Sequence, residues 1–139
     1  MKIKEVMEEV VETASSGETI EQAARKMKLR DVGFLPVIDN GRILGVVTDR
    51  DRVLRAVSAG LRPHMTTVRE VMTPKAASCY EDYSLSDASL VMEKNHVRRL
   101  LVLDRNERLV GVVSLSDLAV KTHNDRLSGH VLGKVASVA

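Results

Sequence analysis

The chain has 139 residues, about the size of one domain or of two small units that share a core. Hydrophobic residues make up 44% of it and aromatic residues only 2%, so the core must be aliphatic and the base-stacking platforms of single-strand nucleic-acid binders are not expected. The formal charge of +2 argues against a bulk polyanion binder and leaves room for a local anion pocket.

The first half of the chain predicts a strand, a helix, a hairpin and a second helix. A β-prone segment covers residues 10–14, and Ile20, Ala23, Ala24 and Met27 follow with helical spacing. The runs FLPVI and ILGVV flank DNGR, which predicts a hairpin because Asn and Gly tolerate the positive φ of tight turns. A second helix is expected over about 50–59, with Val53, Leu54 and Val57 on its apolar side.

The second half repeats this pattern. Residues 5–7 and 70–72 both read EVM, and at this offset of 65 the apolar positions of the two halves coincide. One extra residue in DRNER relative to DNGR then aligns GVVTDRD at 45–51 with GVVSLSD at 111–117. The second copy therefore predicts a strand at 76–79, a helix from Leu85, a hairpin and a helix at about 116–124. A repeat of this length indicates duplication of one supersecondary unit.

Each half reads β-α-β-β-α, with strands that are apolar on both faces. We therefore expect an α/β fold of two pseudo-twofold-related repeats packed sheet to sheet, because half of this chain buries little core alone. We expect repeat 1 over 1–60, a linker over 61–69, repeat 2 over 70–124, and a tail over 125–139 that forms a short helix or frays.

A hydroxyl and an acid stand three residues apart at the end of the third strand of each copy. These are Thr48 and Asp51 in the first copy, and Ser114 and Asp117 in the second. Ser/Thr-x-x-Asp at a helix start is a variant of the capping box. The same groups could also bind a nucleotide, with the hydroxyl on a phosphate or sugar and the acid on both hydroxyls of a ribose. Both interpretations stay open at this point.

The order h-P-V-h-D…G-h-h-T-x-x-D, occurring twice with EVM before each copy, resembles a tandem pair of CBS domains, or Bateman module. The resemblance covers residues 1 to about 124 and is strongest to the small stand-alone CBS-pair proteins of bacteria and archaea. It implies a non-catalytic regulatory sensor that binds AMP, ADP, ATP or S-adenosylmethionine in clefts between the repeats. It also implies a homodimer acting on a regulated protein that the sequence does not identify.

The resemblance assigns the ribose contact to Asp51 and Asp117 and the hydroxyl contact to Thr48 and Ser114. Within the second copy only, a basic pair precedes the hairpin: Arg98 and Arg99 stand where the first copy has Gly33 and Phe34.

Arg98 and Arg99 could bind phosphate or face solvent, as arginines usually do. Phe34 and Pro36 complete the candidate ligand-binding residues, since a proline within a strand indicates an edge or irregular position of the kind found beside a cleft. If only one cleft is filled, we expect it to be the one with Asp117.

No other chemistry is expected. Cys79, the single cysteine, reads as an inert core thiol, and His64, His96, His123 and His130 lack metal-ligand spacing, so no metal site is expected. No nucleophile, base and orienting group come together, so we do not expect an enzyme. Without a leader or an apolar run of ~20 residues, a cytoplasmic protein with no membrane helix is expected. The alternative function is a ligand-free dimeric scaffold for protein interactions, whereas nucleic-acid binding has little support.

Overall fold

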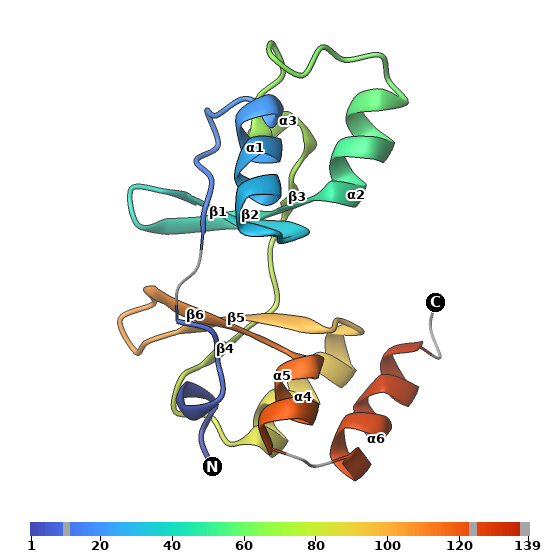
Figure 1. Cartoon of the computed structure of the whole chain (residues 1–139). Coiled ribbons are helices and arrows are strands. Elements are labelled where there is room, and N and C mark those ends of the chain that lie inside the picture. The colour runs from blue at the N-terminus through green and yellow to red at the C-terminus, as the bar shows by residue number, and fades with distance from the viewer. Residues whose placement is uncertain (10–11, 123–124, 137–139) are drawn as a thin grey trace. The chain divides into compact units, whose positions relative to one another are not determined.

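The structure, a computed structural model, describes residues 1–9, 12–122 and 125–136. Two compact units are present, Glu12–Ala76 and Met1–Val11 with Ala77–Ala139. We call them the first and the second unit. Each contains a three-stranded sheet with its helices on one side of that sheet (Figure 1). The mixed α/β fold with two similar sheets is therefore confirmed.

The first unit contains α1 (Ile20–Arg30), β1 (Phe34–Asp39), β2 (Arg42–Thr48), α2 (Asp49–Asp51), the π-helix η2 (Arg52–Val57), α3 (Val68–Val71) and β3 (Thr73–Pro74). The first helix, the hairpin and the second helix come in the predicted order, whereas α3 and β3 were not predicted. Those of the second unit are the 3-10 helix η1 (Ile3–Glu5), β4 (Ser78–Tyr80), α4 (Leu85–Asn95), β5 (Arg99–Leu103), β6 (Leu109–Ser114), α5 (Leu115–Thr122) and α6 (Asp125–Ala136).

The long helices α1 and α4 begin and end at equivalent residues. Thr19 and Ser84 cap their first turns, accepting from the N–H groups of Gln22 and Asp87 at 3.2 and 3.1 Å. Asp31, one residue after α1, adopts the left-handed conformation, as does its counterpart after α4. The duplication thus preserves the signals that start and stop each helix.

Both sheets follow one plan. In the first, Ala14 makes a parallel bridge to Val37 of β1, which pairs antiparallel with β2, and β2 pairs with β3. In the second, β4 runs parallel to β5, β5 pairs antiparallel with β6, and Glu8 bridges Val112 of β6. The strand expected at 10–14 is therefore an isolated bridge at Ala14, while residues 10–11 lie outside the described part of the chain. The hairpin prediction is confirmed, with φ of 51° at Asn40 and 77° at Gly41.

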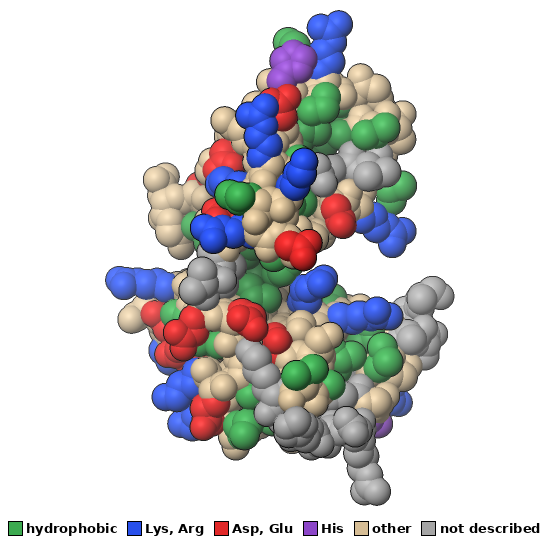
Figure 2. Space-filling view, in the orientation of Figure 1, with side chains coloured by type: hydrophobic (Ala, Val, Ile, Leu, Met, Phe, Trp, Pro, Cys, Tyr) green, Lys and Arg blue, Asp and Glu red, His purple; other side chains and the backbone are tan. Residues whose placement is uncertain are grey.

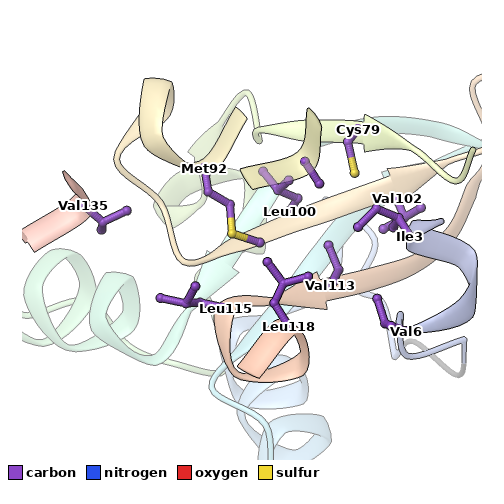
Figure 3. Packing of buried hydrophobic residues seen from close by; sticks show 11 residues of the cluster. Ile3, Val6, Cys79, Met92, Leu100, Val102, Val113, Leu115, Leu118 and Val135 are labelled. Atoms are coloured by element: carbon purple, nitrogen blue, oxygen red, sulfur yellow. The ribbon is translucent and has the colours of Figure 1, made fainter. Parts of the chain in front are cut away.

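Each of the two segments that carry EVM packs in the unit that contains the hairpin of the other repeat. Val68 and Val71 of α3 are fully buried in the core of the first unit, with Ile20, Leu35 and Val47. Their counterparts Ile3 and Val6 are buried in the core of the second unit, where Figure 3 shows Ile3 beside Val102 of β5. Each core is therefore completed by the segment that precedes the other repeat in sequence.

The second helix of the first repeat differs from the expectation. Its start at Asp49–Asp51 is α-helical, but Arg52–Val57 is π-helical. Because a π-helix has more residues per turn, the side chains rotate relative to an α-helix, and Ala56 is buried. The side chain of Val53, predicted on the same side as Leu54 and Val57, lies outside the described part of the structure. Leu54 and Val57, predicted on the core-facing side, are 53% and 68% exposed. That prediction is wrong for both residues.

Candidate functional site

The hydroxyl and the acid of each motif bind each other's backbone at a strand-to-helix junction. Asp51 N–H donates to Thr48 Oγ1 at 3.0 Å, and Thr48 N–H donates to Asp51 Oδ2 at 3.2 Å. In the second repeat Asp117 N–H donates to Ser114 Oγ at 3.0 Å, and Ser114 N–H to Asp117 Oδ2 at 2.9 Å. The capping interpretation is thus confirmed in both repeats. The ribose interpretation stays a prediction. The same contacts hold each carboxylate in a fixed orientation, as a ribose contact would require.

The carboxylate of Asp51 has further partners within its unit. Thr73 Oγ1 on β3 lies 3.2 and 3.1 Å from its two oxygens, and Arg55 NH1 lies 3.7 Å from Oδ1. Arg55 also donates to the carbonyls of Val71 and Met72 at 2.8 Å. Asp51 is only 9% exposed, so its carboxylate mainly holds the α3–β3 segment against the sheet.

The second motif has a different neighbour at the corresponding place. Thr73 pairs with Val46 in the first sheet, and Glu8 pairs with Val112, the counterpart of Val46, in the second. A carboxylate therefore replaces the hydroxyl at this position of the second sheet. Asp117 is half-buried, in contrast to the buried Asp51. The two sites are therefore chemically unequal, through a difference that the sequence comparison did not predict.

A pocket of about 640 Å³ opens in the second unit beside Ser114. The described residues that line it are Arg98, Arg99, Ser114, Leu115, Ser116, Ala119, Gly129 and Leu132. The carbonyl of Arg98 accepts from Leu115 N–H at 2.8 Å, which joins the start of β5 to the start of α5. Both arginines are exposed and permanently charged, so the pocket offers two cations and two serine hydroxyls to an anion.

The pocket brings together three of the predicted site residues, Arg98, Arg99 and Ser114. Asp117 lies in the first turn of α5 but does not line the pocket. The other four, Thr48, Asp51, Phe34 and Pro36, belong to the first unit. Sequence reasoning missed the other five lining residues, Leu115, Ser116, Ala119, Gly129 and Leu132. For the last two, only the expectation of a helical tail gave any signal.

Pro36 lies buried in β1, next to a register shift between Val37 and Ile38. β5 has the same shift between Val102 and Leu103 without a proline, so the irregularity is common to both strands and does not depend on Pro36. Its carbonyl accepts from Ala14 N–H at 2.9 Å. The second repeat has Leu101 at this position, and Leu101 N–H donates to Ala77 O at 3.0 Å. A proline there would lose this hydrogen bond, which explains the departure of the second copy.

Cys79 and two of the histidines occupy defined places in the second unit. Cys79 is buried in β4, and burial raises the pKa of its thiol to about 12, so it is protonated at neutral pH. His96 ends α4 in the left-handed conformation, and His130 Nε2 lies 3.1 Å from Glu93 Oε1. His123 lies outside the described residues. Among the residues that the structure describes, no three His, Cys, Asp or Glu side chains gather as metal ligands.

Charged groups gather at a few exposed places in both units (Figure 2). Asp39 accepts from Ser16 through its backbone N–H at 2.9 Å and through its hydroxyl, and these bonds lower the pKa of the Asp39 carboxyl. Arg105 donates twice to Asp82 at 2.9 Å and lowers its pKa likewise. Both contacts join a hairpin to another loop, and none of these four residues lines the pocket.

No helix within the described ranges is long and apolar enough to span a membrane.

Comparison with known proteins places this geometry in a family. The model of the CBS domain matches the chain twice, at residues 3–55 and 68–123. The chain belongs to the CBS-domain family. It is 40% identical over 134 residues to the CBS domain-containing protein YhcV of Bacillus subtilis, covering 96% of this chain and 94% of that protein.

Solved structures of CBS proteins have the same fold. The crystal structure of Hypoxic Response Protein I with two coordinated zinc ions has a TM-score of 0.76 at 33% identity, covering 86% of this chain and 97% of that one. The relative named hypoxic response protein 1 comes from Mycobacterium tuberculosis. The CBS domain pair of protein MJ0100, in complex with 5′-methylthioadenosine and S-adenosyl-L-methionine, has a TM-score of 0.75 at 24% identity, covering 89% and 97%. This tandem CBS protein is thus built like other regulatory CBS pairs.

Proposed function

We propose that this protein is a non-catalytic regulatory sensor that binds an adenosine-containing ligand beside Ser114 and Asp117. The candidates are AMP, ADP, ATP and S-adenosylmethionine. Asp117 accepts from the ribose hydroxyls, Ser114 contacts the ligand through its hydroxyl, and Arg98 and Arg99 neutralise a phosphate where one is present.

The observation that carries the proposal is the pocket in which Arg98, Arg99 and Ser114 meet. Ser114 links it to the ribose-binding candidate, because its hydroxyl also accepts from Asp117 N–H. The complex of MJ0100 with two adenosyl compounds supports this ligand class through a shared fold. We place the ligand at the second motif because the arginine pair and the pocket lie beside it.

Thermal unfolding with and without each of the four ligands tests the proposal, using Asp117→Ala and the matched control Asp51→Ala. Each substitution removes the acid of a capping box, which costs the ligand-free protein about 1 kcal/mol. Asp51→Ala should cost more, because the Asp51 carboxylate also contacts Thr73 and Arg55. A ligand at 100 times its Kd stabilises the folded state by about 2.7 kcal/mol. We expect this gain in the wild type and in Asp51→Ala, and its loss in Asp117→Ala.

The scaffold alternative gives a different result. It is favoured by the reciprocal capping contacts in both repeats, through which the two acids stabilise the starts of helices without any ligand. If no adenosyl compound stabilises the wild type, and both variants lose the same stability with and without nucleotide, the scaffold function stands and the sensor function fails.

The proposed working form is a homodimer in a cytoplasmic setting. Large apolar side chains are exposed on helices of both units, including Leu54, Val57, Leu90 and Val120. Figure 2 shows hydrophobic side chains at the surface of each unit. Association through such side chains removes them from water and provides the driving force for a symmetric pair. The regulated protein would then read the ligand-dependent arrangement of the dimer.

A further inference from the structure

The C-terminal helix α6 lies outside both regions that match the CBS domain, yet it packs within the second unit against α4 and α5 (Figure 1). Val135 of α6 is buried in the core that contains Met92 and Leu118. His130 Nε2 lies 3.1 Å from Glu93 Oε1 on α4, whose side chain is largely buried. The helix is therefore docked at a defined place by apolar burial and by one polar contact.

Docked in this way, α6 forms one side of the pocket beside Ser114. Gly129 and Leu132, three residues apart on the helix, line it together with Arg98 and Arg99 from the start of β5 and Ser116 of α5. None of the described residues that line the pocket is acidic. The glycine leaves space at this wall, because a Cβ at residue 129 would meet no atom within 4 Å.

We propose that α6 completes an anion-binding pocket, in which Arg98 and Arg99 hold a phosphoryl group against the helix, and that occupancy of the pocket favours the docked state of α6. The proposal deepens the function proposed above and rests on it for the identity of the anion, a nucleotide phosphate. A site built from two elements binds only when both are in place, so ligand and helix docking stabilise each other by linkage. The C-terminal helix thereby becomes the part of the chain that responds to the ligand.

Two glycines of α6 provide a matched pair of variants. A Cβ at Gly133 also meets no atom within 4 Å, but Gly133 does not line the pocket. Replacing either glycine with glutamate increases helix propensity by the same amount and adds the same charge. Only Gly129→Glu puts that charge at the wall shared with the two arginines.

Calorimetric titration of the full chain with ATP, inorganic pyrophosphate and adenosine measures the effect. We expect Gly129→Glu to weaken ATP and pyrophosphate binding about tenfold, the size expected for one added like charge near a half-exposed anion. Gly133→Glu should bind like the wild type. Adenosine has no phosphate and should bind both variants equally. Amide hydrogen exchange in residues 125–136 should slow when ATP or pyrophosphate is added to the wild type.

The outcomes separate this inference from the proposed function. The role of α6 is refuted if Gly129→Glu binds ATP and pyrophosphate as tightly as Gly133→Glu does, or if neither ligand slows amide exchange in α6. Adenosine binding that depends on Asp117 would in that case still support the sensor. If pyrophosphate binds and responds to Gly129→Glu but no adenosyl compound depends on Asp117, the anion pocket stands and the adenosyl function fails. An adenosine affinity that also falls in Gly129→Glu would show general disruption and contradict the phosphate assignment.

Discussion

Gly45 in β2 and Gly111 in β6 lie where the residues after EVM pair with these strands: Thr73 and Pro74 with β2, and Glu8 with β6. A Cβ at Gly45 would overlap the carbonyl oxygen of Thr73. A Cβ at Gly111 would lie 2.7 Å from Met7 Sδ and 2.8 Å from the Glu8 carbonyl oxygen. Real Cβ atoms do not approach backbone this closely, so the glycine of the GVV motif is required for the pairing of the crossing segment.

We therefore expect Gly45→Ala to lower the free energy of unfolding by about 2 kcal/mol, because the added methyl group forces β3 away from β2. The control is Gly17→Ala, since a Cβ at Gly17 meets no atom within 4 Å and the change should stay within about 0.5 kcal/mol. Urea unfolding followed by circular dichroism measures both. Equal stability of the two variants would show that the crossing segment is not held at this distance.

At the residue scale, sequence comparison identified the chemistry of the motif but not its partners. Thr48, Asp51, Ser114 and Asp117 were found because a hydroxyl and an acid recur at one offset. Thr73, which contacts the Asp51 carboxylate, could not be found in this way, because its partner is 22 residues distant and the second repeat has Glu8 at the matching place. Contacts between an element and a segment that crosses from elsewhere leave no periodic signal in a sequence.

Among the elements, the second helix of the first repeat departs most from its sequence pattern. Val53, Leu54 and Val57 have α-helical spacing, but the π-helical stretch Arg52–Val57 turns Leu54 and Val57 outward and buries Ala56. The spacing rule fails here because it assumes 3.6 residues per turn. The two hairpins and the first helix of each repeat were predictable, since their signals are local, whereas β3 was not predicted and the strand expected at 10–14 is a bridge at Ala14.

The exposed apolar side chains of η2 lead to a prediction about the proposed homodimer. The double substitution Leu54→Glu with Val57→Glu should convert it to a monomer in light scattering after size-exclusion chromatography, because two charges cannot be desolvated at an apolar interface. The fold should persist, since both side chains are exposed in the chain itself. Leu29→Glu, at a leucine of α1 that is 80% exposed, is the control and should leave the mass unchanged. A double variant that remains dimeric would place the interface elsewhere.

Considered as a whole, the molecule has two cores, and neither is made from one repeat alone. The sequence correctly predicted two copies of one unit, because apolar positions recur at a constant offset. It did not predict that residues 3–7 pack in the second unit and residues 68–72 in the first, since both arrangements fit the same pattern. Which copy a short segment joins depends on chain connections and contacts of high sequence separation.

The exchange predicts where two equivalent substitutions act. Ile3→Ala should speed amide hydrogen exchange in β5 and β6, whereas Val68→Ala, at the counterpart position, should speed it in β1 and β2. Both side chains are fully buried, so each change leaves a cavity and costs about 2 kcal/mol or more. Mass spectrometry of peptides from the two sheets measures the effect. The reverse pattern, with each substitution loosening the repeat that follows it directly, would contradict the exchange of segments.

The same exchange sets an order for folding during synthesis. The first unit is continuous in sequence, from Glu12 to Ala76, whereas the second requires residues 1–11 to meet a stretch that begins at Ala77. A chain that emerges from the ribosome N-terminus first can complete the first core while Ile3 and Val6 still have no partners. Ile3 and Val6 thus leave the ribosome before the first unit but are buried after it, and their apolar side chains stay available to chaperones until β5 and β6 have been made.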